Sequence, residues 1–194
     1  MKNGNVLMMV EVAVFAALAL LLDMVSQFIF SRIWPQGGSI SIAMVPVFIM
    51  AFRWGIKGGL LSGLLLGLLQ IVTGFASIAH PVQGFLDYPL AFTLVGIAGV
   101  FAGGIQNSFL KGNRKKSYIL MTLGIFAGSF LRFLCHFASG IVFFGSYAPE
   151  GQPVALYSLV YNGTYMAISF ILSAIIAVLL YSTAHRTLFK KALT

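Results

Sequence analysis

The sequence predicts an all-α membrane protein, a bundle of six transmembrane helices with both termini in the cytoplasm. Of its 194 residues, 59% are hydrophobic and only 8% are charged, whereas a typical soluble domain has about 45–50% apolar and about 25% charged residues. The apolar residues form blocks of about 18 residues or more, separated by short polar or basic breaks. Because no linker divides the chain, residues 1–194 are expected to form one domain embedded in the lipid bilayer.

Six apolar blocks are the predicted membrane spans. They run over Val6 to Phe30, Ser39 to Phe52, Ile56 to Phe75, Gly84 to Gly104, Tyr118 to Phe144 and Val154 to Ser182. The second block is shorter than the roughly 20 residues that a helix needs to cross the bilayer, and Pro46 is expected to kink it. It is still counted as a span because residues 53–57 are typical of a tight turn at the membrane interface.

The basic residues support this topology. With six spans they gather on one side, which the positive-inside rule assigns to the cytoplasm. They are Lys2, Arg53, Lys57, Lys111, Arg114, Lys115, Lys116, Arg186, Lys190 and Lys191. The loops predicted on the other side, residues 32–38, 77–83 and 145–153, carry a single basic residue. The net charge of +8 therefore reflects membrane topology, and no nucleic-acid partner is expected.

Small residues four positions apart predict close contacts between helices. They are Gly59, Gly63 and Gly67 in the third block, Gly99 and Gly103 in the fourth, and Gly124 and Gly128 in the fifth. Ala13 and Ala17 repeat this spacing in the first block. Two interpretations of that pair stay open, because a small-residue face packs equally well inside the bundle or against a helix of a partner protein.

Catalytic chemistry is not indicated. The chain has four acidic residues and no phosphate-cradling GxxxxGK[ST] loop. His80, His136 and His185 lack the spacing of a zinc site, and no complete Ser/His/Asp arrangement is visible. The single Cys135 excludes an internal disulfide. We therefore expect a protein that is not an enzyme and that has no metal ion or cofactor.

Three polar residues inside apolar blocks are the main functional candidates, since such groups usually face a cavity or a partner. At 1.5 Å per residue, His136 and Asn162 each lie about 12 Å below the outer end of their helices. Asp87 lies about 5 Å below the same surface. These side chains from three different helices are therefore expected to meet in the outer half of the membrane.

Aromatic residues surround these three positions in the sequence. They are Trp34, Tyr88, Phe143, Phe144, Tyr147 and Tyr157. An aromatic cage with one carboxylate suits a flat organic cation. The alternative is an ordinary aromatic belt, with His136 and Asn162 joining helices by hydrogen bonds. Arg132 is expected to pair with a carboxylate such as Asp23 or with helix-end carbonyls, whereas Gln70 and Gln83 receive no role.

Several segments also resemble a known family. They are EVAVFAALAL from Glu11, PQGGSISIAMVPVFIMAFRWGIKGG from Pro35, HPVQGFLDY from His80 to Tyr88, and RFLCHFASGIVFFGSYAPEGQPVALYSLVYNGTY from Arg132 to Tyr165. In this order they resemble the thiamine-specific substrate-binding (S) components of energy-coupling-factor (ECF) transporters, the ThiT or YuaJ family. The resemblance covers most of the chain.

The resemblance implies a six-helix substrate-binding domain in the bacterial plasma membrane that captures thiamine from outside. Its partners would be a membrane T-component and two ATPase subunits. Matching positions imply that the pocket is formed by Trp34, Asp87, His136, Phe144, Tyr157 and Asn162, with Tyr88 and Tyr147 beside them. Asp87 would balance the thiazolium charge or accept from the aminopyrimidine. This sequence departs from the family pattern in having an aspartate at position 87 instead of glutamate, and Phe144 instead of tryptophan.

Two other functions remain as alternatives. The chain could be an S-component for another vitamin or a thiamine precursor, since the scaffold would be the same. It could also be a stand-alone ion-coupled carrier that uses Asp87 and His136 as a proton relay. The shallow predicted depth of these residues, and the lack of a repeat between the two halves of the sequence, argue against the carrier.

Overall fold

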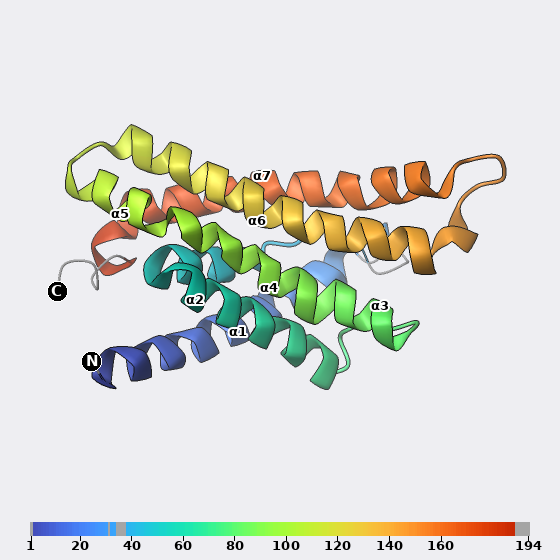
Figure 1. The fold of residues 1–194 in the computed structure, drawn as a ribbon, viewed down its shortest axis with the longest axis horizontal. Helices are drawn as coiled ribbons and strands as arrows, with labels where there is room; N and C mark the ends of the chain where they lie inside the picture. Colours follow the sequence, from blue (N-terminus) through green and yellow to red (C-terminus); the bar gives the residue numbers. More distant parts are fainter. Residues whose placement is uncertain (1, 31, 34–37, 189–194) are drawn as a thin grey trace.

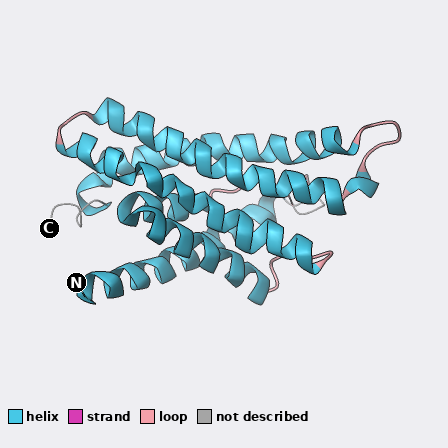
Figure 2. Cartoon of the chain, in the orientation of Figure 1, coloured by secondary structure: helices cyan, strands magenta, loops and turns pink. Residues whose placement is uncertain are grey.

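The chain folds into an elongated bundle of helices. The computed structural model describes residues 2–30, 32–33 and 38–188. Within these ranges every regular element is helical, and the helices run roughly along one long axis (Figure 2). The beginning of α1 and the connection from α5 to α6 lie at one end of the bundle, and the loop before α7 lies at the other (Figure 1).

Five helices in the described residues are long and apolar enough to cross a membrane. Four of them are α1 (Lys2–Phe30), α2 (Met44–Val72), α6 (Arg114–Phe143) and α7 (Val154–Leu188). The fifth runs from Pro81 to Leu110 and changes its winding along the way. It consists of α3 (Pro81–Phe85), the π-helix η1 (Leu86–Leu90), α4 (Ala91–Val95), the 3-10 helix η2 (Gly96–Phe101) and α5 (Ala102–Leu110). A short 3-10 helix, η3 (Gly145–Tyr147), follows α6.

Helix α2 is sharply bent at Gly55, and the predicted spans Ser39 to Phe52 and Ile56 to Phe75 lie on either side of this residue. Gly55 has φ 73° and ψ −164°, a conformation that glycine adopts readily because it lacks a Cβ atom. A Cβ atom on Gly59 would lie 2.8 Å from the Cβ of Ala51, whereas eight residues of straight helix span about 12 Å. The chain therefore folds back on itself within residues 53–57, where the sequence predicted a turn.

The kink predicted at Pro46 is wrong. Pro46 is the third residue of α2, which begins at Met44. The first four N–H groups of a helix have no partner within the helix, so a proline there removes no hydrogen bond. The bend occurs nine residues later, at Gly55.

The first half of α2 forms the centre of the bundle. Every residue from Met44 to Phe52 is buried. Phe48 stacks on Phe52 with ring centroids 6.3 Å apart, and Phe52 meets the edge of Tyr181 from α7 at 6.2 Å. Residues of α1, α6 and α7, among them Ala19 and Ile125, complete this core. The short block that the sequence marks as its weakest span is therefore the most deeply enclosed helix segment.

Glycines bring the second half of α2 into backbone contact with the helix that runs from Pro81 to Leu110. A Cβ atom on Gly63 would lie 1.9 Å from the carbonyl oxygen of Phe92, and one on Gly67 would lie 2.7 Å from that of Tyr88. The predicted close packing is thus present for these glycines. Gly103 differs, because a Cβ atom there would have no neighbour within 4 Å, so the packing role expected for it is wrong.

An ion pair joins α1 to α2 near the end of the bundle where α1 begins. Arg53 Nε and Nη2 donate to the two carboxylate oxygens of Glu11 at 2.6 and 2.7 Å, a bidentate geometry that is among the strongest for ion pairs. Trp54 Nε1 donates to the same carboxylate at 2.6 Å. Arg53 Nη1 also donates to the carbonyl oxygen of Leu188 at 2.8 Å, which connects the pair to the end of α7.

The glycine contacts predict a clear difference between two alanine substitutions. Gly63→Ala places a methyl group on the Phe92 carbonyl, so we expect a loss of stability of roughly 1–3 kcal/mol from overpacking. Gly103→Ala is the matched control, since alanine has room there and favours a helix over glycine by up to about 1 kcal/mol. Thermal unfolding of the purified proteins in detergent measures both. A Gly63→Ala protein at least as stable as the Gly103→Ala protein would contradict the contact.

Candidate binding site

A cavity lies between the helices, on the side of the bundle away from the beginning of α1. Its wall is formed by α1, α2, α3, η1, α4, α6 and α7, together with the segment before α2 and the loop after it. The lining residues are Asp23, Gln27, Gly38, Ser39, Gln70, Ser77, Gln83, Asp87, Tyr88, Phe92, Arg132, His136, Ser139, Gly140, Phe144, Tyr157, Tyr161, Asn162 and Tyr165.

Six of the eight residues that the sequence proposed for a pocket line this cavity: Asp87, Tyr88, His136, Phe144, Tyr157 and Asn162. Tyr147 does not line it. Its side chain is 55% exposed, and its ring lies 6.3 Å from that of Phe144, at the rim. Trp34 lies outside the described residues. Tyr157 and Asn162 are five positions apart in α7, yet both reach the cavity because it is wide enough to contact two faces of that helix.

Asp87 is hydrogen-bonded to side chains from its own helix and from α6. It is 7% exposed and belongs to the π-helix η1, which also contains Pro89. Proline has no N–H to offer an α-helix, and π-helical turns are frequent at functional sites. Gln83 Nε2 and Ser139 Oγ each donate to Asp87 Oδ2 at 2.7 Å. His136 Nδ1 lies 2.9 Å from Asp87 Oδ1.

The ring of His136 lies between Arg132 and Asp87. Arg132 Nε lies 3.2 Å from His136 Nε2, and Asp87 Oδ1 lies 2.9 Å from His136 Nδ1. Because a guanidinium only donates hydrogen bonds, the contact with Arg132 favours Nε2 as the acceptor, with a ring hydrogen on Nδ1 facing Asp87.

Arg132 has neither of the partners that the sequence suggested. In the part of the chain that the structure describes, it forms no ion pair with Asp23. Its guanidinium contacts His136, and it lies over the ring of Phe92 at 4.8 Å from the ring centre. A cation over an aromatic face is stabilised by the ring quadrupole. Arg132 therefore belongs to the wall of the cavity and positions His136.

Asn162 connects α7 to α6. Its Nδ2 donates to the carbonyl oxygen of Ser158 at 3.0 Å and approaches that of His136 at 3.3 Å, while Oδ1 accepts from Tyr165 at 2.8 Å. Gly140 makes room for this contact, because a Cβ atom there would lie 2.2 Å from Ser158 Oγ. The contact places Asn162 level with His136, as the depth estimate predicted.

Sequence reasoning missed one part of the site. Asp23 and Gln70 form a second polar wall, and Asp23 Oδ2 accepts from Gln70 Nε2 at 2.6 Å. Gln83, which was also left without a role, donates to Asp87. An acid inside the first apolar block was the available signal for Asp23. A single glutamine in an apolar helix gives no such signal, because its partner lies on another helix.

Ala13 and Ala17 lie far from this cavity, on the outer face of α1. Both are exposed, whereas Ala16 and Ala19 on the opposite face of the same helix are completely buried. In this chain the pair therefore faces away from the bundle.

Comparison with known proteins identifies the family. A family model described as "Thiamine transporter protein (Thia_YuaJ)" matches residues 9–189. The chain belongs to this thiamine transporter family. It is therefore a multi-pass protein of the bacterial cell membrane that serves transport and not catalysis, and the resemblance found in the sequence is confirmed.

Relatives of this family member agree over almost their whole length. It is 47% identical over 187 residues to "Thiamine transporter ThiT" of Bacillus subtilis (strain 168), a match that covers 96% of both chains. It is 30% identical to "Thiamine transporter ThiT" of Lacticaseibacillus paracasei, over 94% of this chain and 90% of the relative. A solved structure of ThiT from Listeria monocytogenes superposes with a TM-score of 0.88 at 31% identity, over 96% of this chain and all of the other.

The protonation of His136 in this family member can be measured directly. We expect 15N NMR of histidine-labelled protein at neutral pH to show, for His136, a protonated Nδ1 and an unprotonated Nε2, because Arg132 donates to Nε2. His136→Gln identifies the signal by its loss, and His80 and His185 provide internal references. Two protonated ring nitrogens on His136 would contradict the arrangement.

Proposed function

We propose that this chain is the substrate-binding (S) component of an ECF-type importer, that it binds thiamine from the external side, and that it delivers thiamine inward with a membrane T-component and two ATPase subunits. The observation that carries the proposal is the cavity itself. It combines buried carboxylates with an aromatic wall in a chain of the thiamine transporter family. The sequence has no phosphate-cradling loop of its own, which fits an energy source on other subunits.

The chemistry of thiamine fits this wall. Thiamine consists of a cationic thiazolium ring and an aminopyrimidine ring, so it presents one positive charge, two flat faces and several hydrogen-bonding atoms. Phe144 and Tyr157 offer ring faces for stacking, and Trp34 would contribute another. Asp87, His136 and Asn162 lie deeper and would contact polar ring atoms. Tyr88 and Tyr147 would border the two rings, with Tyr147 at the rim.

We also propose that the chain crosses the membrane six times, with both termini in the cytoplasm. Residues 38–42 have no regular secondary structure and precede the first half of α2. Five residues of non-helical chain can span up to about 16 Å, and the helix from Met44 to Trp54 adds about 16 Å, enough together for a hydrocarbon core of about 30 Å. Non-helical backbone is tolerated at this depth when protein encloses it. Ser41 N accordingly donates to Ser169 Oγ at 3.0 Å.

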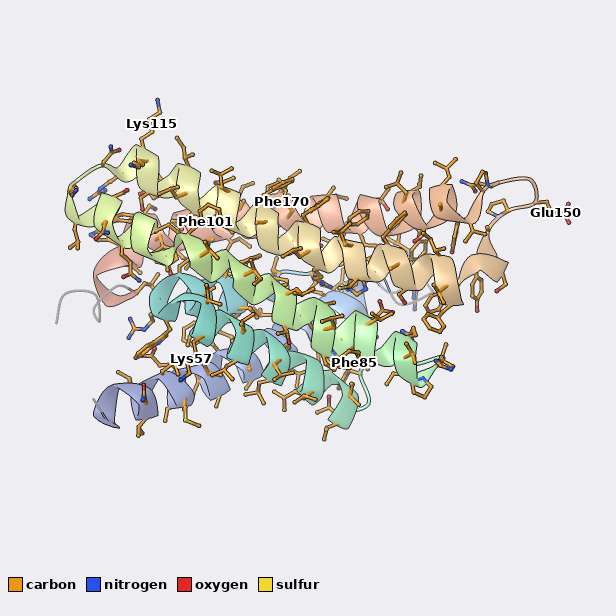
Figure 3. All side chains as sticks on the ribbon, in the orientation of Figure 1. Lys57, Phe85, Phe101, Lys115, Glu150 and Phe170 are labelled. Carbon is orange, nitrogen blue, oxygen red and sulfur yellow. The ribbon has the colours of Figure 1, made fainter. Side chains whose placement is uncertain are left out.

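The charges support the same orientation. Lys57 and Lys115 lie toward the end where α1 begins, whereas Glu150 lies at the opposite end (Figure 3). Basic residues are enriched on the cytoplasmic side of membrane proteins. The cavity therefore opens in the outer half of the membrane, where external thiamine arrives.

The exposed pair Ala13 and Ala17 is the proposed contact with the T-component. In lipid, helices associate through close van der Waals packing, and small residues allow their backbones to approach. The outward orientation of both alanines leaves this face available to a helix of another subunit.

Ligand binding by the isolated chain tests the function. We expect purified protein in detergent to bind thiamine without ATP or an ion gradient, because all proposed contacts belong to this one chain. A titration with a panel of vitamins and thiamine precursors, followed by intrinsic fluorescence, measures this. Tight binding of another vitamin with no binding of thiamine would overturn the substrate, and a need for sodium ions or protons would favour the ion-coupled carrier.

Ala17→Trp separates binding from transport. A bulky ring on the proposed contact face should leave thiamine binding nearly unchanged but abolish ATP-driven uptake and co-purification with the T-component. Ala167→Trp provides the matched control, since Ala167 is also exposed but lies on α7, and its uptake should be normal. Normal uptake by the Ala17→Trp protein would refute the contact, as would thiamine uptake in cells that lack the energising subunits.

A further inference from the structure

The buried carboxylate of Asp23 is held by neutral hydrogen-bond donors. Asp23 is 5% exposed and lines the cavity from α1. Its oxygens accept from Gln27 Nε2 at 2.7 Å, Ser41 Oγ at 2.8 Å and Gln70 Nε2 at 2.6 Å. All three donors are neutral, and no basic side chain among the described residues forms an ion pair with it. A buried charge inside a membrane helix is costly unless it is compensated.

Gln70 is left with an unused acceptor beside this carboxylate. It is 1% exposed and also lines the cavity. Its Nε2 donates to Asp23 Oδ2, and its Oε1 has no hydrogen-bond partner. Buried polar atoms are nearly always hydrogen-bonded, so an unsatisfied one needs an explanation. A ligand that places an N–H or O–H group at this wall would provide one.

The fixed charges of the cavity do not cancel. Among the described residues that line it, Asp23 and Asp87 are acidic and Arg132 is basic. The two carboxylates therefore share one guanidinium, which interacts electrostatically with both.

We propose that Asp23 supplies an uncompensated negative charge and that, together with Gln70, it forms a second polar wall that selects ligands with one positive charge. Asp87 is in direct contact with the imidazole of His136, whereas the hydrogen-bond donors to Asp23 are all neutral. A cation in the cavity would provide Asp23 with a counter-charge. The inference rests on the proposed function, because thiamine provides the required single charge on a flat ring.

A comparison of two ligands tests the charge of Asp23. The probes are thiamine and its neutral isostere, in which carbon replaces the charged ring nitrogen. Asp23→Asn keeps the shape of the side chain and removes the charge. We expect it to weaken thiamine binding about ten- to hundredfold, and to change binding of the isostere by less than about threefold. Isothermal titration of the purified protein measures both.

Two further variants separate charge from hydrogen bonding. Asp23→Glu keeps the charge and should preserve the preference for thiamine over the isostere. Gln70→Met removes the neighbouring amide without changing the charge, so it should weaken both ligands by the same factor. If Asp23→Asn lowers the affinity for both ligands by the same factor, the preference for thiamine is unchanged. That result would overturn the inference and make Asp23 a structural residue.

The native protein provides a test that does not depend on the folding of any variant. It should bind thiamine at least about tenfold more tightly than the isostere, since one buried charge is uncompensated. Equal affinities would overturn the inference while leaving thiamine binding in place. Binding of neither ligand would overturn the proposed function itself and this inference with it.

Discussion

A carboxylate enclosed by apolar helices must be surrounded by hydrogen-bond donors. In the candidate site, the side chains around Asp87 are positioned by their hydrogen bonds to it. Gln83, one helical turn before it, and Ser139 on α6 both donate to it. His136 adds a third contact through Nδ1, while its other ring nitrogen faces Arg132. The acid, the imidazole and the guanidinium therefore hold one another in place, and α6 is held against η1 by the same contacts.

Packing and binding are connected in this bundle through α2. Gly67 touches the backbone of Tyr88 beside the cavity. Gln70, one turn further along α2, reaches Asp23 on α1. The close approach that glycine permits thus determines the distance between the two polar walls. A larger residue in place of Gly67 would push α2 away from η1. Gln70 would then move away from the rest of the site, even though Gly67 itself does not line the cavity.

The sequence predicts most of the fold and the centre of the site, for a simple physical reason. Hydrocarbon thickness fixes the length of each apolar block, and a constant rise per residue converts position into depth. This is sufficient to bring Asp87, His136 and Asn162 to one level. Depth does not specify rotation about a helix axis, however. Whether Arg132 faces Asp23 or His136 depends on the rotation of each helix about its axis. In a uniformly apolar helix, the hydrophobic pattern does not determine this rotation.

Other differences between sequence and structure have equally local causes. Pro46 was expected to interrupt a helix, but α2 begins at Met44, only two residues before it. Gly103 has the spacing of a packing residue but faces no neighbour. Asp23 was considered only as a partner for Arg132, because nothing in a single sequence shows that Gln27, Ser41 and Gln70 converge on it.

The segment before α2 has a consequence for how the chain is made. Ser41 lies in this segment, and its N–H is satisfied by Ser169, which is 128 positions later in the chain. The ribosome therefore releases this segment long before α7 exists to enclose it. Backbone N–H and C=O groups without partners are costly in lipid. The segment before α2 therefore reaches its final arrangement only after α7 has been made.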